Sequence, residues 1–494
     1  MAPVKSLGSN YQTNGFYDEM LAGADQPRPA YRRLYEQLNG LGAEELERRH
    51  ELAMQMFRNH GITFAVYPDA QGNEKVFPFD IIPRVISAGT WRRLEAGLKQ
   101  RLTALNLFLE DVYGRKLILK QRVVPAEIVL SSTQYMREVE GLAVPHGIHC
   151  HIAGIDLVRD DKGEFYVLED NLRTPSGVSY VLANRHVMKR VLPDLFAGHP
   201  VRPIEGYVHE LIRHLRWLAP AGVEDPTIVL LTPGINNAAY YEHLYLAKQM
   251  GIELVEGTDL VVDQDHVFMR TTRGLNPVHV IYRRLDDEWL DPIFGRQESL
   301  VGVAGLVSAF RAGNVAIANG LGNGVADDKA VYAFVPKMIR YYLDEDPILP
   351  NVHTYLCAID DDRRFVLEHL DELVVKTVDA SGGYGMLIGP ASTQEERDRF
   401  RHRIEAHPRS FIAQPVVALS VQPILDGGKF RRTHQDLRPF VLTGPDIHVT
   451  PGGLTRVALR PGSLVVNSSQ GGGSRDTWVM AEDDGEPAEV EGDA

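Results

Sequence analysis

Long hydrophobic runs, cysteines and clusters of basic residues are all scarce in this sequence, and each scarcity excludes a class of protein. Nowhere do about eighteen apolar residues follow one another, and the N-terminal stretch MAPVKSLGSNYQTNG has no apolar centre, so neither a membrane span nor a signal peptide is predicted. Two cysteines, Cys150 and Cys357, are too few for a disulfide framework and are interpreted as buried thiols. We therefore expect a cytoplasmic protein with no membrane partner.

The excess of acidic residues argues against nucleic acid as a partner. The chain has 52 Lys and Arg against 66 Asp and Glu, a net charge of -14, and no stripe of basic residues that could follow a phosphate backbone. Half of this charge lies in residues 481–494, AEDDGEPAEVEGDA, which carry seven acids. This tail is predicted to be disordered, and the remaining charge of about -7 is ordinary for a globular protein.

Helical and strand patterns intermix along the 494 residues, which predicts an α/β or α+β protein of two or three packed units. Three early helices are expected to end at Gly40, Gly61 and Gly114, and the third carries leucines at spacings of three and four that form one buried stripe. Residues 226–262 show a strand, a turn, an amphipathic helix and another strand, which is the βαβ pattern of a doubly wound domain.

A β-hairpin is predicted in residues 147–171. Its strands GIHCHIAGIDLVRD and EFYVLEDN flank a turn at residues 160–163. Closing this hairpin brings Asp156 opposite the region of Glu169. Because side chains alternate along a strand, Glu169 and Asn171 share one face and Asp170 points to the other.

Asp156, Glu169 and Asn171 are interpreted as metal ligands. They offer only oxygen donors, a set that suits Mg2+ shared with substrate phosphates and does not suit zinc. The alternative is that these acids are solvated or paired with neighbouring arginines, but three oxygen donors on one face favour the metal. Nearby, His149 and His151 are interpreted as packing residues, since a strand alone arranges them poorly for closing a metal site.

A second group of polar residues follows the strand DELVVKT. Lys376 lies near the end of this strand, which leads into the loop Ser381, Gly382, Gly383, Tyr384 and Gly385 and then into an apolar strand at residues 386–388. Backbone N–H groups in such a loop can converge on phosphate oxygens, and the lysine adds a charge. A glycine-rich hairpin without a ligand is an equal alternative, since the loop matches neither the Walker pattern nor the dinucleotide fingerprint.

Other polar groups allow more than one interpretation. Lys329 precedes a helical stretch and by itself reads as a surface lysine. Arg283, Arg284, Asp286 and Asp287 end a strand, where they either hold a substrate carboxylate and amine or form a solvated turn. No Ser-His-Asp or Cys-His set can be assigned, because no strand–Ser–helix elbow frames the serines that precede glycines.

These stretches together resemble the ATP-grasp ligases, and most closely the circularly permuted ATP-grasp type 2 family, which is related to the glutathionylspermidine synthetase branch. Lys329, Lys376, the SGGYG loop, the hinge FIAQP and the strand Asp436-Leu437-Arg438 follow the order of an ordinary ATP-grasp chain, whereas the metal set comes far upstream. That displacement is typical of a circular permutation. The resemblance covers residues 15–480 and includes the stretches LEDNLRTPSGVSYVLANR and GGLTRVALRPGSLVVNSSQGGGSRDTW.

The resemblance implies a circularly permuted ATP-grasp fold with a Rossmann-like pre-ATP-grasp domain and a helical N-terminal segment. The expected units are a mostly helical segment at 1–130, the metal-binding part of the ATP-grasp domain at 131–220, a Rossmann-like substrate domain at 221–325, the ATP-binding part at 326–480 and a disordered acidic tail at 481–494.

The resemblance also implies roles for the site residues, except for Arg283 and Arg284, whose expected contact with the substrate comes from their charge and their place at a strand end. ATP would be bound by Lys329, Lys376, the loop from Ser381 to Gly385 and the hinge residue Gln414, and one or two Mg2+ by Asp156, Glu169 and Asn171. Arg438 and Arg456 would stabilise the transferred phosphoryl group. Arg173, Ser176 and Gly177 would face the acceptor, and Arg283 and Arg284 would contact the substrate. Asp170 has no fixed role in the family pattern.

The implied activity is that of an ATP- and Mg2+-dependent carboxylate–amine ligase. Such an enzyme activates a small-molecule carboxylate as an acyl phosphate, which an amine or peptide then attacks. Positioning and charge neutralisation carry this chemistry, so no protein nucleophile is expected. Two alternatives stay open: an ATP-dependent kinase of a small molecule, and an ATP-binding interaction protein without turnover.

Overall fold

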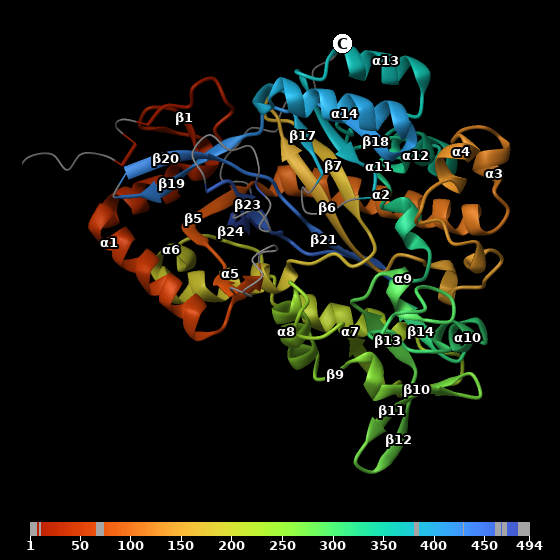
Figure 1. Cartoon of the computed structure of the whole chain (residues 1–494). Helices are drawn as coiled ribbons and strands as arrows, with labels where there is room; N and C mark the ends of the chain where they lie inside the picture. Colours follow the sequence, from red (N-terminus) through yellow and green to blue (C-terminus); the bar gives the residue numbers. More distant parts are fainter. Residues whose placement is uncertain are drawn as a thin grey trace, which may run out of the picture.

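Three four-stranded sheets with helices on their faces form the body of the molecule (Figure 1). The computed structural model describes residues 7–8, 11–65, 74–379, 385–427, 429–459, 466 and 472–482. Within these ranges no helix combines the length and apolar character needed to cross a bilayer. Cys150 and Cys357 are both free and buried, as predicted.

The first sheet is entirely parallel and confirms the predicted βαβ pattern. Its strand order is β14 (Ala316–Ala318), β13 (Val280–Arg283), β8 (Ile228–Leu231) and β9 (Glu253–Val255). Helix α8 (Tyr240–Met250) joins β8 to β9, and α10 (Leu306–Arg311) precedes β14. An antiparallel sheet of β10 (Leu260–Asp263), β11 (His266–Thr271) and β12 (Gly274–Val278) extends from this unit at the bottom of Figure 1.

The second sheet contains the predicted hairpin. Its antiparallel order is β22 (Ile447–Val449), β21 (Phe440–Thr443), β6 (Ile152–Arg159) and β7 (Phe165–Asn171). Helix α2 (Ala88–Tyr113) covers one face, and its leucine stripe packs in the same core as Ile155 and Leu157 of β6. Gly114 follows the last residue of α2, as predicted.

The third sheet carries the second lysine and the hinge. Its order is β15 (Tyr355–Leu356), β18 (Phe411–Pro415), β16 (Leu373–Thr377) and β17 (Leu387–Ile388), all antiparallel. Helices α13 (Asp360–Glu368) and α14 (Gln394–Ala406) lie beside this sheet at the top of Figure 1. A separate small core, which includes Cys357, Val366, Val375, Ile404 and Phe411, holds this unit together.

The N-terminal part of the chain contains strands as well as the expected helices. Helix α1 (Arg32–Asn59) spans both of the first two predicted helices and bends at Gly42, where the backbone φ of +76° is easily adopted by glycine. The predicted end at Gly40 is therefore wrong by two residues, while the second end falls just before Gly61. Strand β5 (Phe79–Ile86) runs parallel to β24 (Gly473–Val479), so an early strand pairs with the last strand of the described chain.

The remaining strands and α-helices are short or connect these units. They are β1 (Leu21–Gly23), β2 (Gln26–Pro27), β3 (Thr63–Ala65), β4 (Glu74–Val76), β19 (Val421–Asp426), β20 (Lys429–His434), β23 (Thr455–Val457), α3 (Leu117–Lys120), α4 (Ala126–Leu130), α5 (Val178–Val191), α6 (Pro193–Ala197), α7 (Tyr207–Trp217), α9 (Asp287–Leu290), α11 (Lys329–Tyr332) and α12 (Val335–Leu343).

A single buried amide joins the parallel sheet to the hairpin sheet. Asn319, at the end of β14, is 1% exposed, and its Oδ1 accepts hydrogen bonds from the backbone N–H groups of His151 (2.6 Å) and Ile152 (2.7 Å). Its Nδ2 donates to the carbonyl oxygens of Ile152 (2.7 Å), Leu172 (2.6 Å) and Arg173 (3.1 Å). Both ends of the hairpin are thus tied to the neighbouring sheet.

Replacement of this amide should destabilise the fold. Asn319→Ala leaves several buried backbone groups without partners, so the free energy of unfolding should fall by about 2–4 kcal/mol. Urea denaturation followed by circular dichroism measures the loss. Asn314→Ala is the control, because its amide makes one exposed hydrogen bond to the Asp265 carbonyl and its removal should change the value by less than about 0.5 kcal/mol. Equal effects would contradict this assignment.

Candidate active site

The hairpin register places the three predicted metal ligands on one face. Asp156 pairs with Glu169, and Gly154 pairs with Asn171, with an irregularity in the register just after Asp156. Residues that are paired across a sheet, or two apart on one strand, point to the same side. The hairpin therefore aligns the two carboxylates and the amide, as predicted, and turns Asp170 toward α2.

Asp156 belongs to a buried cluster of two aspartates and two arginines. It accepts hydrogen bonds from Arg438 Nε (2.5 Å) and Nη2 (2.9 Å) and from Arg456 Nη2 (2.7 Å). Asp436 accepts from the same Arg456, with Nη2 at 2.5 Å. Burial acts to raise the pKa of Asp156, but the two guanidinium groups outweigh it and hold the pKa well below its ordinary value. The two arginines expected at the phosphoryl group thus lie directly beside Asp156.

The first lysine lies opposite the other predicted metal carboxylate. Lys329 begins α11, and its Nζ lies 2.8 Å from Glu169 Oε1. Asp328 caps this helix by accepting from Ala330 N–H, and the Lys329 N–H donates to the carbonyl of Val378, just beyond β16. These contacts bring the start of α11 next to the strand that carries the second lysine.

The second lysine contacts the predicted hinge. Lys376 Nζ donates to Gln414 Oε1 (2.7 Å), and Gln414 Nε2 donates in turn to Thr354 Oγ1 (3.0 Å). Burial lowers the pKa of Lys376 to about 8, with Glu169 opposing this shift and Lys329 adding to it. Because these charges influence one another, Lys376 belongs to the same electrostatic site as the hairpin carboxylates.

Part of the predicted glycine loop lies outside the described residues. Ser381, Gly382, Gly383 and Tyr384 are in this undescribed segment, so its predicted role as a phosphate cradle stays a prediction. Gly385 is described and has a φ of +69°, a conformation that favours glycine. The strand expected after the loop is present as β17.

Arg173 lies beside the hairpin end, among acidic side chains. Its Nε donates to Asp327 Oδ2 (2.7 Å), and its Nη1 lies 3.7 Å from Asp286. The Leu172 N–H also donates to Asp327. Arg173 therefore stands at the end of β7, two residues beyond Asn171, in surroundings that carry negative charge.

The loop with Ser176 and Gly177 is held in place by a buried glutamate that sequence reasoning missed. Glu242 of α8 accepts from the N–H groups of Gly177 (2.7 Å) and Ser179 (3.0 Å) and from the Ser179 hydroxyl (2.9 Å). Gly177 has a φ of +121°, and a Cβ there would lie 2.8 Å from Leu454 Cδ2. This position therefore requires glycine for both conformation and space.

The two arginines predicted at the substrate are interior side chains. Arg283 is fully buried and donates to the carbonyls of Asn319, Leu285 and Gly320. Arg284 donates to Pro175 O (2.8 Å) and Glu242 Oε1 (3.1 Å). Arg283 thus bonds to backbone carbonyls in the interior. Arg284 supports the Ser176–Gly177 loop through Pro175 and through Glu242, which bonds to the Gly177 N–H. His149 and His151 are also buried, and burial lowers the pKa of both, as suits packing residues.

The hairpin donors suit a hard cation in their chemistry. Among the described residues no three His, Cys, Asp or Glu side chains converge, and the predicted set has two carboxylates and one amide. The Asn171 Nδ2 is buried and donates to no described group. An amide binds a hard cation through its oxygen, so Oδ1 is the atom that would face the metal. Both oxygens of Asp156 are occupied by arginines. Asp156 accepts three hydrogen bonds from arginines, whereas Glu169 pairs with Lys329 through Oε1, so Glu169 and Asn171 fit a Mg2+ shared with phosphate oxygens more directly than Asp156 does.

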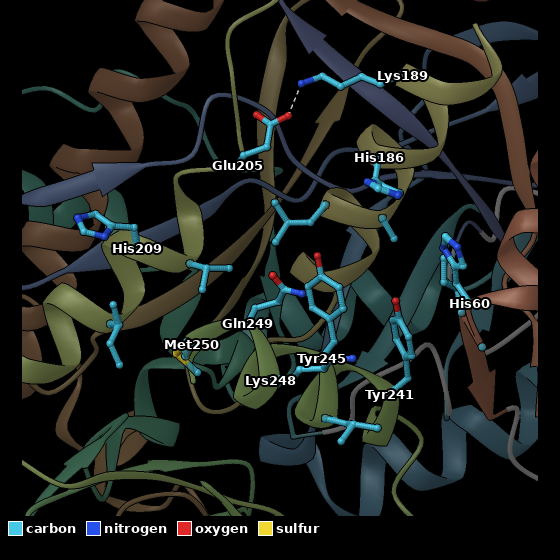
Figure 2. Close-up of a pocket in the computed structure, with 17 residues that line it drawn as sticks. His60, His186, Lys189, Glu205, His209, Tyr241, Tyr245, Lys248, Gln249 and Met250 are labelled. Atoms are coloured by element: carbon cyan, nitrogen blue, oxygen red, sulfur yellow. Dashed lines mark hydrogen bonds and ion pairs between the residues drawn. The ribbon is translucent and has the colours of Figure 1, made fainter. Parts of the chain in front are cut away.

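A separate hollow of about 1070 Å³ contains none of the predicted residues. It lies between the end of α1 and helices α5, α7 and α8, and Figure 2 shows the side chains that face it. Tyr241 and Tyr245 of α8 and Met250 line one side, and an ion pair between Lys189 and Glu205 spans the rim. The predicted site residues of the hairpin, Lys329, Lys376 and the cluster of Arg438 and Arg456 are not among its lining residues, so this hollow is not the candidate active site.

Residues 83–458 match the family described as circularly permuted ATP-grasp type 2. An uncharacterized protein from Synechocystis sp. is 54% identical over 472 residues, which cover 95% of this chain and 98% of that protein. A protein from Frankia casuarinae named "Putative glutamate--cysteine ligase 2-2" is 42% identical over 475 residues, 96% of this chain and 54% of that protein. This chain therefore spans about half of the Frankia relative.

A glutathione synthetase-like effector from Globodera pallida, solved in its apo form, has a similar structure. The TM-score is 0.58 at 11% sequence identity, and the match covers 88% of this chain and 97% of that chain. At this identity the likeness concerns the fold alone. Together with the family match, it confirms the expected α/β class and the circularly permuted ATP-grasp fold.

The lowered pKa of Lys376 predicts a pH-dependent affinity for ATP. With a pKa of about 8, the ammonium is charged at pH 7 and loses its proton as the pH rises to 9 and above. Because a charge-assisted hydrogen bond is then lost, the affinity should fall by about tenfold between pH 7 and pH 9.5, measured by calorimetry. Lys376→Met should bind more weakly at pH 7 and flatten the profile. An unchanged slope in the variant would refute the assignment.

Proposed function

Because the chain belongs to the circularly permuted ATP-grasp type 2 family, we propose that it is an ATP- and Mg2+-dependent carboxylate–amine ligase that releases ADP and phosphate. The observation that carries the proposal is the convergence of two lysines, two arginines and two carboxylates around the hairpin face. Lys329 and Lys376 are proposed to supply positive charge for the phosphates. Arg438 and Arg456 lie beside Asp156, and Glu169 is proposed to bind the metal.

The proposed reaction has two steps. A substrate carboxylate oxygen attacks the γ-phosphorus of ATP, the bond to the β-phosphate oxygen breaks, and ADP leaves. An amine then attacks the acyl phosphate carbon, loses a proton and expels inorganic phosphate, which leaves an amide. Both steps concentrate negative charge on phosphoryl oxygens, so positioned cations lower both barriers. No protein nucleophile is needed.

Each proposed role follows from a contact. Lys376 and Gln414 form the nucleotide-side pair. Asp156 orients Arg438 and Arg456, which are proposed to neutralise the transferred phosphoryl group.

Magnesium is proposed to bind at the hairpin carboxylates. Glu169 and Asn171, with Asp156 beside them, would hold a bound Mg2+, which neutralises phosphate charge as a Lewis acid. Glu169 and Lys329 form an ion pair. When Mg2+ and ATP bind together, the Glu169 carboxylate is proposed to bind the Mg2+ and the Lys329 ammonium to bind a phosphate.

The acceptor side is proposed to lie at the hairpin end. Arg173 and the loop at Ser176 and Gly177 would face the substrate, and Arg284 holds that loop through Glu242. The glutamate–cysteine ligase name belongs to a Frankia protein of which this chain spans about half, so it suggests amino acids or small peptides as substrates without assigning that activity to the matching half.

Purified protein incubated with Mg2+, ATP and amino acids or short peptides distinguishes the alternatives. ADP and phosphate released together with an amide product, identified by mass spectrometry, support the ligase. A stable phosphorylated product supports a kinase, and ATP binding without ADP formation supports an interaction protein. Either of the last two results would overturn the proposal.

Two substitutions test the site. Glu169→Ala and Lys376→Ala should each lower kcat/KM for ATP at least about a hundredfold, because each removes a charge that acts on the phosphates. Steady-state ADP release measures the effect. Glu164→Ala is the matched control on the same hairpin, since this side chain is half exposed and pairs with Arg93 at the surface. Full activity of both site variants would show that the catalytic face is misassigned.

A further inference from the structure

The acid with no role in the family pattern makes a fully buried ion pair behind the site. Arg101 of α2 donates Nε to Asp170 Oδ1 (2.7 Å) and Nη2 to Asp170 Oδ2 (2.6 Å), and both side chains are 1% exposed. Asp170 lies between Glu169 and Asn171 on β7. Because successive strand side chains alternate, a bidentate bond to Asp170 also fixes the direction of its two neighbours on the opposite face.

The same guanidinium reaches the element that carries the first lysine. Arg101 Nη1 donates to Asn351 Oδ1 (2.7 Å), and Asn351 Nδ2 donates to the carbonyl of Tyr332 (2.9 Å). Tyr332 ends α11, one turn after Lys329, and its ring centroid lies 5.4 Å from the Arg101 guanidinium carbon. The Tyr332 hydroxyl donates to Val167 O on β7 (2.5 Å). Both partners of the Glu169–Lys329 ion pair are thus connected to Arg101.

The segment that holds Asn351 continues to the hinge. Its neighbours pair with β7, since the Val167 N–H donates to Pro350 O (2.8 Å) and the Val352 N–H to Val167 O (2.9 Å). Three residues after Asn351, Thr354 accepts from Gln414, the residue that binds Lys376. Polar contacts joined by short stretches of backbone therefore link Arg101 to both lysines.

We propose that Arg101 is a positioning residue of the nucleotide site, which sets the geometry of Glu169, Asn171 and Lys329 for joint binding of Mg2+ and ATP. This inference rests on the proposed function. Arg101 lies on the core side of β7, so its proposed role is indirect and involves no contact with nucleotide or metal. It acts through Asp170 and Asn351.

Arginine is required for this task because of its shape. Its planar group donates to two acceptors of one carboxylate and to a third acceptor in a fixed fork, whereas lysine offers a single point of donation on a flexible stem. Removal of either charge alone would leave its partner buried and unpaired, which destabilises a protein strongly. A test must therefore separate loss of positioning from loss of stability.

The chain offers a matched control. Arg185 of α5 is also 1% exposed, donates Nε to Asp476 Oδ2 (2.8 Å), and lies 5.4 Å from the ring centroid of Phe196. It ties α5 to β24 and contacts none of the hairpin donors or lysines. Arg185→Lys and Arg101→Lys therefore make the same substitution at two buried arginine–aspartate pairs, of which Arg101 is bidentate to its aspartate and Arg185 also donates to two backbone carbonyls.

ATP is titrated by calorimetry into the wild type, Arg101→Lys and Arg185→Lys, once in saturating Mg2+ and once in EDTA. The ratio of the Kd for ATP in EDTA to the Kd in Mg2+ measures how much Mg2+ strengthens ATP binding, and this ratio is called the Mg2+ strengthening. Arg101→Lys should lose about tenfold of this strengthening, and Arg185→Lys should keep it at a comparable fall in melting temperature. If Mg2+ strengthened ATP binding equally in both variants, the positioning role of Arg101 would be overturned while the proposed function would stand. A wild type that does not bind ATP would overturn the proposed function and this inference with it.

A double variant keeps the test decisive if Arg101→Lys folds poorly. Arg101→Met combined with Asp170→Leu replaces the buried ion pair by apolar side chains and should restore thermal stability, as such exchanges often do. Mg2+ strengthening should stay about tenfold below wild type, because the fork that orients β7 and Asn351 is gone. Recovery of both stability and Mg2+ strengthening would show that Arg101 serves packing only.

Discussion

The pairing register between β6 and β7 is the constraint on which the candidate site depends. Asp156 stands opposite Glu169, and Asn171 follows on the same face. A slip of one residue would turn Asp170 into the site and its neighbours toward α2, since the side-chain period of a strand is two. Two buried contacts oppose such a slip: Arg101 holds Asp170 on the core side, and the Asn319 amide bonds to both ends of the hairpin.

Charge balance explains how so many ionised side chains can lie close together at the candidate site, where they are largely buried. Asp156 and Asp436 offset Arg438 and Arg456, and Glu169 offsets Lys329. Unpaired charges in these positions would carry a desolvation penalty of several kcal/mol each. Lys376 differs, because its hydrogen-bond partner Gln414 is neutral, and burial lowers its pKa. A phosphate would supply the negative charge that this lysine lacks.

Local patterns in the sequence were enough to predict the elements that carry most site residues. Alternating apolar and polar residues on both sides of a turn predicted the hairpin that carries Asp156, Glu169 and Asn171. An apolar strand followed by glycines predicted the element that carries Lys376. The permuted order came from the resemblance, not from periodicity. The bend at Gly42 was missed because a glycine inside a helical pattern marks either an end or a kink.

The supporting residues could not be predicted, because their partners are distant in sequence. Arg101 lies 69 residues from Asp170, Glu242 lies 65 residues from Gly177, and Asn319 lies 167 residues from Ile152. No spacing rule links such pairs. In the primary sequence each is one polar residue in a helix or at a strand end, and only the tertiary packing of distant elements gives it a partner.

The order of the chain has a physical consequence for how the site is assembled. The parallel sheet, residues 228–318, lies in sequence between the hairpin and Lys329, yet the hairpin contacts both. Polar side chains bridge these units: Asn319 reaches the hairpin ends, and Glu242 reaches the loop at Gly177. Because such bonds are short and directional, the parallel sheet cannot shift without moving that loop relative to the lysines. The unit expected to hold the substrate is thereby coupled mechanically to the face expected to hold the phosphates.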